Sequence, residues 1–171
     1  PTNVISITDG QIFLESELFN AGMRPAVNVG LSVSRVGGAA QTKAMKKAYG
    51  QMRVDLAQFR EMEVFTQFSS DLDPATQAML DHGHVLMELL KQPLYHPLAM
   101  WKEVVILSAA SNGLLDDVAL SDLRSFREGL MNYVEANGAA IVTEMKETGK
   151  LSDESREKLL ELVRTYKKQV N

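Results

Sequence analysis

One arginine stands out as a candidate for chemistry with an anion. Arg35 ends the run Ser32-Val33-Ser34-Arg35, and the pair Gly37-Gly38 follows it closely. The β-branched run predicts a strand and the glycines predict a flexible turn, so the guanidinium would be held outward from a strand end. An arginine so placed beside a nucleotide stabilises charge on a transferring phosphoryl group, with an effect on rate of roughly 10³ to 10⁵. From the residues alone, a surface arginine after a strand is the alternative.

The other polar clusters carry weaker signals for catalysis or metal binding. His82 and His84 are two positions apart, which places them about 200° apart around a helix and disfavours a shared metal ion. Asp116 and Asp117 are adjacent in a predicted connection, where neighbouring carboxylates usually contact only water. His96 lies in a predicted turn and is interpreted as solvated. A phosphate-binding GxxxxGK[ST] loop is absent from the sequence.

Composition limits the classes of protein. The 171 residues carry a net charge of −4, a pI near 5.4 and no cysteine. An acidic chain disfavours a nucleic-acid partner, and the lack of cysteine excludes disulfides, thiol catalysis and Cys-ligated metals. No apolar run approaches the roughly 18 residues of a membrane-spanning helix, and no targeting signal is recognised. We expect an intracellular globular chain, and a start at Pro1 is typical of a fragment.

Two regions with different patterns are predicted to position these side chains. Before a border near Gly37 to Thr42, the runs Val4–Ile7 and Ala26–Val29 are short and rich in β-branched residues, as strands are. Two short strands do not make a stable sheet by themselves. We therefore expect residues 1–42 to be the end of a larger domain that is incomplete here.

Residues 43–171 show the apolar spacing of helices. Met45, Ala48, Met52, Leu56 and Phe59 form one apolar stripe. Further helices are predicted from cap residues and apolar periodicity: one from Asp73-Pro74 to Gln92-Pro93, one over Pro97 to Ser111, one over Ser121 to Gly149, and one that opens with Ser152-Asp153-Glu154. Helices joined by short polar turns favour an all-α bundle, with Trp101 in its core.

The sequence resembles one known family over essentially its whole length. The stretches PTNVISITDGQIFLESELF and MRPAVNVGLSVSRVGGAAQTKAMK, followed by the helical part, are similar to the C-terminal portion of alpha subunits of rotary (F-type) proton-translocating ATP synthases. The resemblance implies a mainly α chain, in which a C-terminal helical bundle follows short strands at the tail of an incomplete α/β nucleotide-binding domain. The missing phosphate-binding loop lies upstream of the matched segment in that family, so the chain looks truncated.

The same resemblance implies roles for five residues. Arg35 would reach across a subunit interface to the nucleotide held by a beta subunit. Phe19, Arg24, Pro25 and Gln92 match positions on the adenine side of the alpha subunit's own non-catalytic nucleotide site. Read from the residues alone, Phe19 is instead a core residue and Gln92 the end of a helix. Many members carry a glutamine where this chain has Leu94, which removes one polar contact to the base.

The family further implies ATP or ADP with magnesium in the intact subunit, and no cofactor in this fragment. Partners would be beta subunits and the central stalk, with no nucleic acid and no direct membrane insertion. The expected location is the cytoplasmic face of the cell membrane, in a peripheral complex that couples proton flow to ATP synthesis; an organelle origin stays open. The isolated fragment is predicted to be inactive. A self-contained helical interaction module without nucleotide chemistry is the alternative function.

Overall fold

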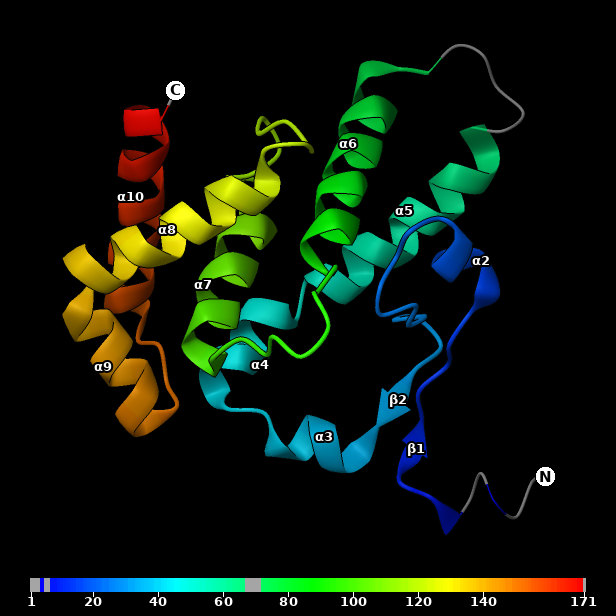
Figure 1. The fold of residues 1–171 in the computed structure, drawn as a ribbon, viewed down its shortest axis with the longest axis horizontal. Helices are drawn as coiled ribbons and strands as arrows, with labels where there is room; N and C mark the ends of the chain where they lie inside the picture. Colours follow the sequence, from blue (N-terminus) through cyan, green and yellow to red (C-terminus); the bar gives the residue numbers. More distant parts are fainter. Residues whose placement is uncertain (1–3, 5–6, 67–71, 171) are drawn as a thin grey trace.

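The fold is mainly α, as the sequence predicts. A computed structural model describes residues 4, 7–66 and 72–170 of the chain. Figure 1 shows a group of helices with the N-terminal segment along one side. The helices of this group are α4 (Lys43–Tyr49), α5 (Met52–Thr66), α6 (Pro74–Leu89), α7 (Met100–Ser111), α8 (Leu123–Asn137), α9 (Ala139–Thr148) and α10 (Asp153–Val170).

The predicted helices are present, but α6 ends at Leu89 before the expected Gln92, α7 begins at Met100 after the expected Pro97, and two breaks were not predicted. Asp73 caps α6, because its carboxylate accepts hydrogen bonds from the main-chain N–H groups of Ala75 and Thr76, both at 3.0 Å. The expected first helix is divided into α4 and α5 after Gly50, and the expected fourth helix is divided into α8 and α9 at Gly138. The apolar period continues across both breaks, so it did not reveal them.

The core lies around α7, which is apolar on nearly every side. Its Trp101, Val104, Val105 and Ala109 are buried, as expected for a helix enclosed by others. It packs against α4 and also contacts α6, α8, α9 and α10. Among the described residues, no helix combines the length and the apolar character that a membrane span requires.

The N-terminal segment contains little regular structure. β1 (Gly10–Gln11) pairs antiparallel with β2 (Val33–Ser34), with Gly10 opposite Ser34. A short helix, α2 (Ser16–Asn20), lies between them in the chain. The segment folds back on itself a second time through an isolated bridge between Leu14 and Val27. β2 confirms the strand predicted before Arg35.

The other strand predictions for this segment were wrong where the structure describes them. Ala26–Val29 makes only the bridge at Val27. Val4 and Ile7 are helical, with the Thr8 N–H donating to the Val4 carbonyl at 3.1 Å, and residues 5–6 lie outside the described residues. The predicted glycine turn after Arg35 is instead the helix α3 (Arg35–Ala40), because Ser34 caps it by accepting a hydrogen bond from the Gly37 N–H at 2.9 Å.

Candidate functional site

Arg35 lies at the end of β2, and its side chain turns back onto the segment before β1. Its Nε donates to the Asp9 carbonyl at 3.1 Å and its Nη2 to the Thr8 carbonyl at 2.8 Å. Arg35 is exposed, and no described carboxylate forms an ion pair with it. The guanidinium is therefore oriented by main-chain carbonyls, and it also interacts electrostatically with the nearby Asp9 carboxylate.

Asp9 fixes the turn that carries Arg35. Its carboxylate accepts hydrogen bonds from the Ser34 hydroxyl and from the Val36 N–H, both at 2.6 Å. These hydrogen bonds, with that of Ser34 the larger cause, hold the pKa of Asp9 below its ordinary value. The Asp9 carboxylate, which lies just before β1, thus holds the two residues on either side of Arg35 at the start of α3.

The four residues predicted for the adenine side form a second, separate group. The Arg24 guanidinium carbon lies 4.5 Å from the centre of the Phe19 ring, a cation–π contact. The Gln92 N–H donates to the Arg24 carbonyl at 2.9 Å, which ties the segment of Arg24 and Pro25 to the end of α6. Phe19 is 52% exposed, so its alternative interpretation as a core residue is wrong.

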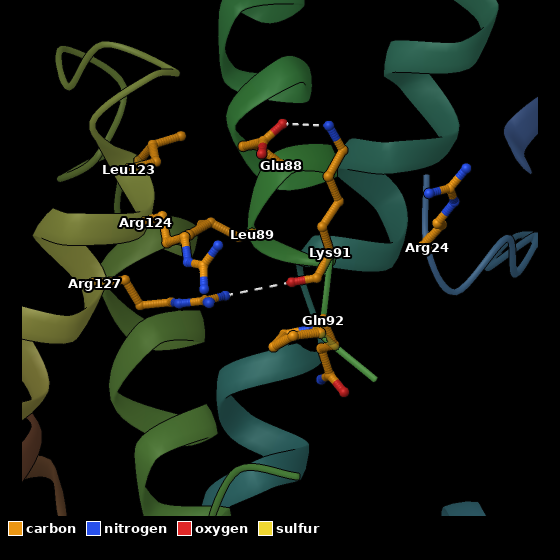
Figure 2. Close-up of a pocket in the computed structure, with 9 residues that line it drawn as sticks. Arg24, Glu88, Leu89, Lys91, Gln92, Leu123, Arg124 and Arg127 are labelled. Atoms are coloured by element: carbon orange, nitrogen blue, oxygen red, sulfur yellow. Dashed lines mark hydrogen bonds and ion pairs between the residues drawn. The ribbon is translucent and has the colours of Figure 1, made fainter. Parts of the chain in front are cut away.

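A pocket of about 240 Å³ opens beside this second group. Figure 2 shows Arg24 and Gln92 on its lining together with residues from the end of α6 and the start of α8. The lining includes Lys91, Arg124 and Arg127, none of which the sequence analysis singled out. The only sequence signal for the last two was the spacing Arg-x-x-Arg, which places both on one face of a helix.

The structure does not bring Arg35 to this pocket. Arg35, at the start of α3, donates its side-chain hydrogen bonds to Thr8 and Asp9, which precede β1. Arg24 contacts Phe19 of α2 and Gln92 just after α6. Figure 1 shows α3 apart from both α2 and the end of α6. The five predicted site residues therefore form two separate sites. One contains the exposed Arg35, and the other contains the ring of Phe19 and the amide of Gln92 beside Arg24 and Pro25.

The histidines and the acidic pair have structural partners. His82 Nδ1 lies 2.7 Å from Asp116 Oδ1, and the ring of His84 packs edge-on against Phe59 instead. The two histidines thus point to different neighbours, as predicted. Asp117 accepts a hydrogen bond from Lys167 at 2.5 Å, which lowers the pKa of Asp117. The interpretation of this acidic pair as simply solvated was wrong, since it anchors the α7–α8 connection.

Comparison with known proteins assigns the family. Residues 41–166 match the model of the ATP synthase alpha/beta chain, C terminal domain, and residues 1–34 match that of the ATP synthase alpha/beta family, nucleotide-binding domain. The chain therefore belongs to the ATP synthase alpha/beta family.

Within that family, the chain is similar to the C-terminal portion of alpha subunits. It is 55% identical over 168 residues to the ATP synthase subunit alpha of Mycolicibacterium smegmatis, covering 98% of this chain and 31% of that protein. It is 53% identical over 168 residues to the subunit alpha of Bordetella pertussis, covering 98% of this chain and 33% of that protein. The chain spans about a third of the length of the curated relatives that it matches.

Proposed function

We propose that this chain is the C-terminal portion of an ATP synthase alpha subunit and supplies Arg35 to a nucleotide site on a neighbouring beta subunit. The observation that carries the proposal is the 55% identity to a subunit alpha over 98% of the chain. The exposed guanidinium of Arg35, which forms no ion pair with a carboxylate among the described residues, supports the role, because an arginine that acts across an interface must keep its charge for the partner's ligand.

Arg35 would act when charge builds up on the transferring phosphoryl group. During hydrolysis the attacking water forms a bond to the γ-phosphorus while the bond to the bridging oxygen breaks, and the peripheral oxygens carry negative charge. A planar guanidinium donates two parallel hydrogen bonds to such oxygens. In this proposal Arg35 leaves the carbonyls of Thr8 and Asp9, 2.8 and 3.1 Å away, when the anion takes their place.

We propose a nucleotide-binding role for the second group of residues as well. Phe19, Arg24, Pro25 and Gln92 would line the adenine side of a non-catalytic site whose phosphate-binding residues lie elsewhere in the subunit. The half-exposed Phe19 ring offers a face for stacking on a base, and Gln92 offers an amide for its polar edge. ATP or ADP with magnesium would bind there in the intact subunit and not in this fragment.

The remaining parts of the proposal concern organisation and partners. Residues 1–42 would be the end of the nucleotide-binding domain and residues 43–171 the C-terminal helical domain. The partners would be beta subunits and the rotating central stalk, in a peripheral complex on the cytoplasmic face of the membrane that couples proton flow to ATP synthesis. Neither a nucleic acid nor the lipid bilayer itself would be a binding partner. The isolated fragment would be inactive.

The test is Arg35→Lys in the alpha subunit of an assembled ATP synthase. We expect steady-state ATP turnover to fall by about 10²-fold or more, with a much smaller change in nucleotide affinity, because the contact strengthens in the transition state. Arg53→Lys is the matched control, since Arg53 is also exposed and donates to a main-chain carbonyl, that of Gly30. An assembled Arg35→Lys complex with nearly normal turnover would show that Arg35 is only structural.

A further inference from the structure

The pocket between the end of α6 and the start of α8 is strongly basic, although the chain as a whole is acidic. Four cationic side chains line it, namely Arg24, Lys91, Arg124 and Arg127, with Glu88 as the one acidic residue. The whole chain carries a net charge of −4. In Figure 2 the side chains of Arg124 and Arg127 both extend from α8 toward Lys91 at the end of α6. This concentration of charge is therefore local to the pocket.

The described residues neutralise only part of this charge. Glu88 pairs with Lys91 at 2.5 Å. The Arg124 Nε lies 3.5 Å from Glu128, and the Arg124 side chain is 74% exposed, so this ion pair is weak. Arg127 has no carboxylate partner among the described residues. At least two guanidinium groups thus remain available to an anion.

Arg127 also has a donor that the protein leaves unused. Its Nη1 donates to the Lys91 carbonyl at 3.5 Å, the limit for a hydrogen bond, and its buried Nε has no acceptor among the described residues. An arginine that only completed the C-terminal end of α6 would use its donors on the last carbonyls of that helix. A buried charged donor without an acceptor is unfavourable. A ligand oxygen in the pocket would give the accessible part of this guanidinium an acceptor that the described chain does not supply.

The shape and the charge of the pocket favour a small oxyanion. A volume of about 240 Å³ is below the roughly 300–1,000 Å³ of sites that enclose drug-sized ligands. Guanidinium groups donate paired hydrogen bonds to phosphate or carboxylate oxygens. Phosphate has more acceptor oxygens and a higher charge than a carboxylate, so it matches two arginines better.

We propose that Arg124 and Arg127, with Arg24 and Lys91 at the rim, form a binding site for a phosphate-type oxyanion. The ligand is inorganic phosphate or the phosphate group of a small ester. Arg24 and Gln92 line this site and also belong to the proposed adenine-binding group. The phosphate site does not depend on adenine binding, because its main anion contacts are Arg124 and Arg127 of α8. It is also separate from Arg35, whose side chain contacts Thr8 and Asp9.

The test is a titration of the 171-residue chain with inorganic phosphate at constant ionic strength, followed by nuclear magnetic resonance. We expect saturable shifts for the amides of residues 88–93 and 123–127 and for the Nε–H of Arg127. Chloride and acetate serve as controls. Shifts that do not saturate, or that chloride or acetate produces at the same concentration, would overturn the assignment to phosphate.

Three variants locate the binding. Arg127→Gln is expected to weaken phosphate binding by about ten- to a hundredfold, the effect of losing hydrogen bonds to a charged group. Arg124→Gln, on an exposed side chain that the fold does not need, should weaken it several-fold and covers the case in which Arg127→Gln fails to fold. Arg164→Gln removes the same charge from an exposed position on α10 outside the pocket and should change nothing. Equal affinities in Arg124→Gln and Arg164→Gln would contradict the site.

Titrations with adenosine and AMP identify the source of the phosphate. AMP that binds more tightly than phosphate, and loses affinity in both Phe19→Ala and Arg127→Gln, supports a nucleotide phosphate. A second outcome is that Phe19→Ala still binds phosphate and adenosine does not bind. This result supports a site for free phosphate and rejects only the adenine role. Adenosine binding without any phosphate binding rejects the oxyanion site and leaves the adenine role standing.

Discussion

The segment before α4 and the helices from α4 onward differ in where their apolar side chains lie. In the described part of the N-terminal segment only Met23, Ala26 and Asn28 are buried, while Leu14 is 71% exposed and Val36 is 67% exposed. The helices instead enclose a continuous core around α7. Both regions contain many apolar residues, so composition does not separate them. The difference is that the helices supply one another with partners, whereas the segment has few within the described chain.

The exposed apolar side chains of the segment gather near its two strands. Ile12, Phe13, Leu31 and Val33 are each more than two-fifths exposed. A soluble protein rarely leaves so many neighbouring apolar groups in water unless another surface covers them. In the proposed function, the rest of the nucleotide-binding domain would cover this face. The contrast between the regions is therefore between helices with their own core and a segment whose apolar side chains are mostly exposed in the described chain.

The largest expected difference between the two regions is in amide hydrogen exchange. The amides of Val104 to Ala110 in α7 become accessible to exchange only when the whole core unfolds. Those of Gly10, Gln11 and Val33 need only the separation of β1 from β2, a ladder of two residue pairs. We expect exchange in the ladder to be faster by about 10³-fold or more. Mass spectrometry or nuclear magnetic resonance on the 171-residue chain measures both sets together. Equal protection would mean that the segment is as stable as the core.

The next largest difference is expected in the free energy of unfolding when one leucine in each region is truncated to alanine. Leu86 in α6 is 0% exposed, so Leu86→Ala leaves a cavity and should reduce the free energy of unfolding by about 2–5 kcal/mol. Leu14→Ala removes the same atoms from an exposed site and should change it by no more than about 0.5 kcal/mol. Urea denaturation of both variants measures the difference. A large loss in Leu14→Ala would place Leu14 in a core that the structure does not show.

A glycine in each region gives a smaller effect of opposite sign. A Cβ on Gly83 in α6 would lie 2.0 Å from Phe59 Cδ2, so Gly83→Ala should destabilise the bundle by about 1–3 kcal/mol. A Cβ on Gly38 in α3 meets nothing within 4 Å, so Gly38→Ala should stabilise that helix locally by about 0.5–1 kcal/mol. Urea denaturation reports the first change and amide exchange in α3 the second. A neutral Gly83→Ala would show that α5 can move away from α6.

The sequence predicted the helices better than the strands, and the reason is the range of the interactions. α6 is specified by local features, with Asp73 as its cap and Pro74 at its first position. β1 consists of Gly10 and Gln11, which have no strand pattern, and its pairing with β2 is accompanied by a long-range hydrogen bond from Ser34 to Asp9. The breaks at Gly50 and Gly138 interrupt an otherwise continuous apolar period, so the period could not reveal them.

The candidate sites also divide into features that the sequence indicated and contacts that only the structure shows. The residue pattern already pointed to Arg35, and family resemblance supplied Phe19, Arg24 and Gln92, which the structure places in one group. No sequence pattern could have placed Arg127 beside Lys91, because their contact depends on how α8 crosses the end of α6. Long-range packing therefore decides where the basic pocket forms.

The smallest expected effects concern two exposed aspartates, one in each region, and their response to acid. Hydrogen bonds lower the pKa of Asp9, first from Ser34, and the pKa of Asp73, first from Thr76. A carboxyl whose pKa is lower in the folded state stabilises that state fully above its unfolded pKa, near 3.8, and loses this contribution as the pH falls through the folded value. Both contacts should therefore weaken as the pH falls below about 4.

The two regions should report this loss differently. Protonation of Asp9 releases the turn at Ser34 and Val36 while the core stays folded. Acid should therefore lower the protection factor of the Val36 amide, the ratio of its intrinsic exchange rate to its measured rate at the same pH, without moving the urea midpoint. Protonation of Asp73 weakens the cap of α6, which belongs to the core, so it should lower the urea midpoint slightly. Asp9→Asn should therefore abolish the acid response of the Val36 amide alone. Asp73→Asn should slightly reduce the pH dependence of the midpoint, because hydrogen bonds also lower the pKa values of Asp117, Glu144, Asp153 and Glu154, and those carboxyls still respond to acid. If Asp9→Asn also reduces the pH dependence of the midpoint, the segment and the helices unfold as one unit, and the distinction between the two regions fails.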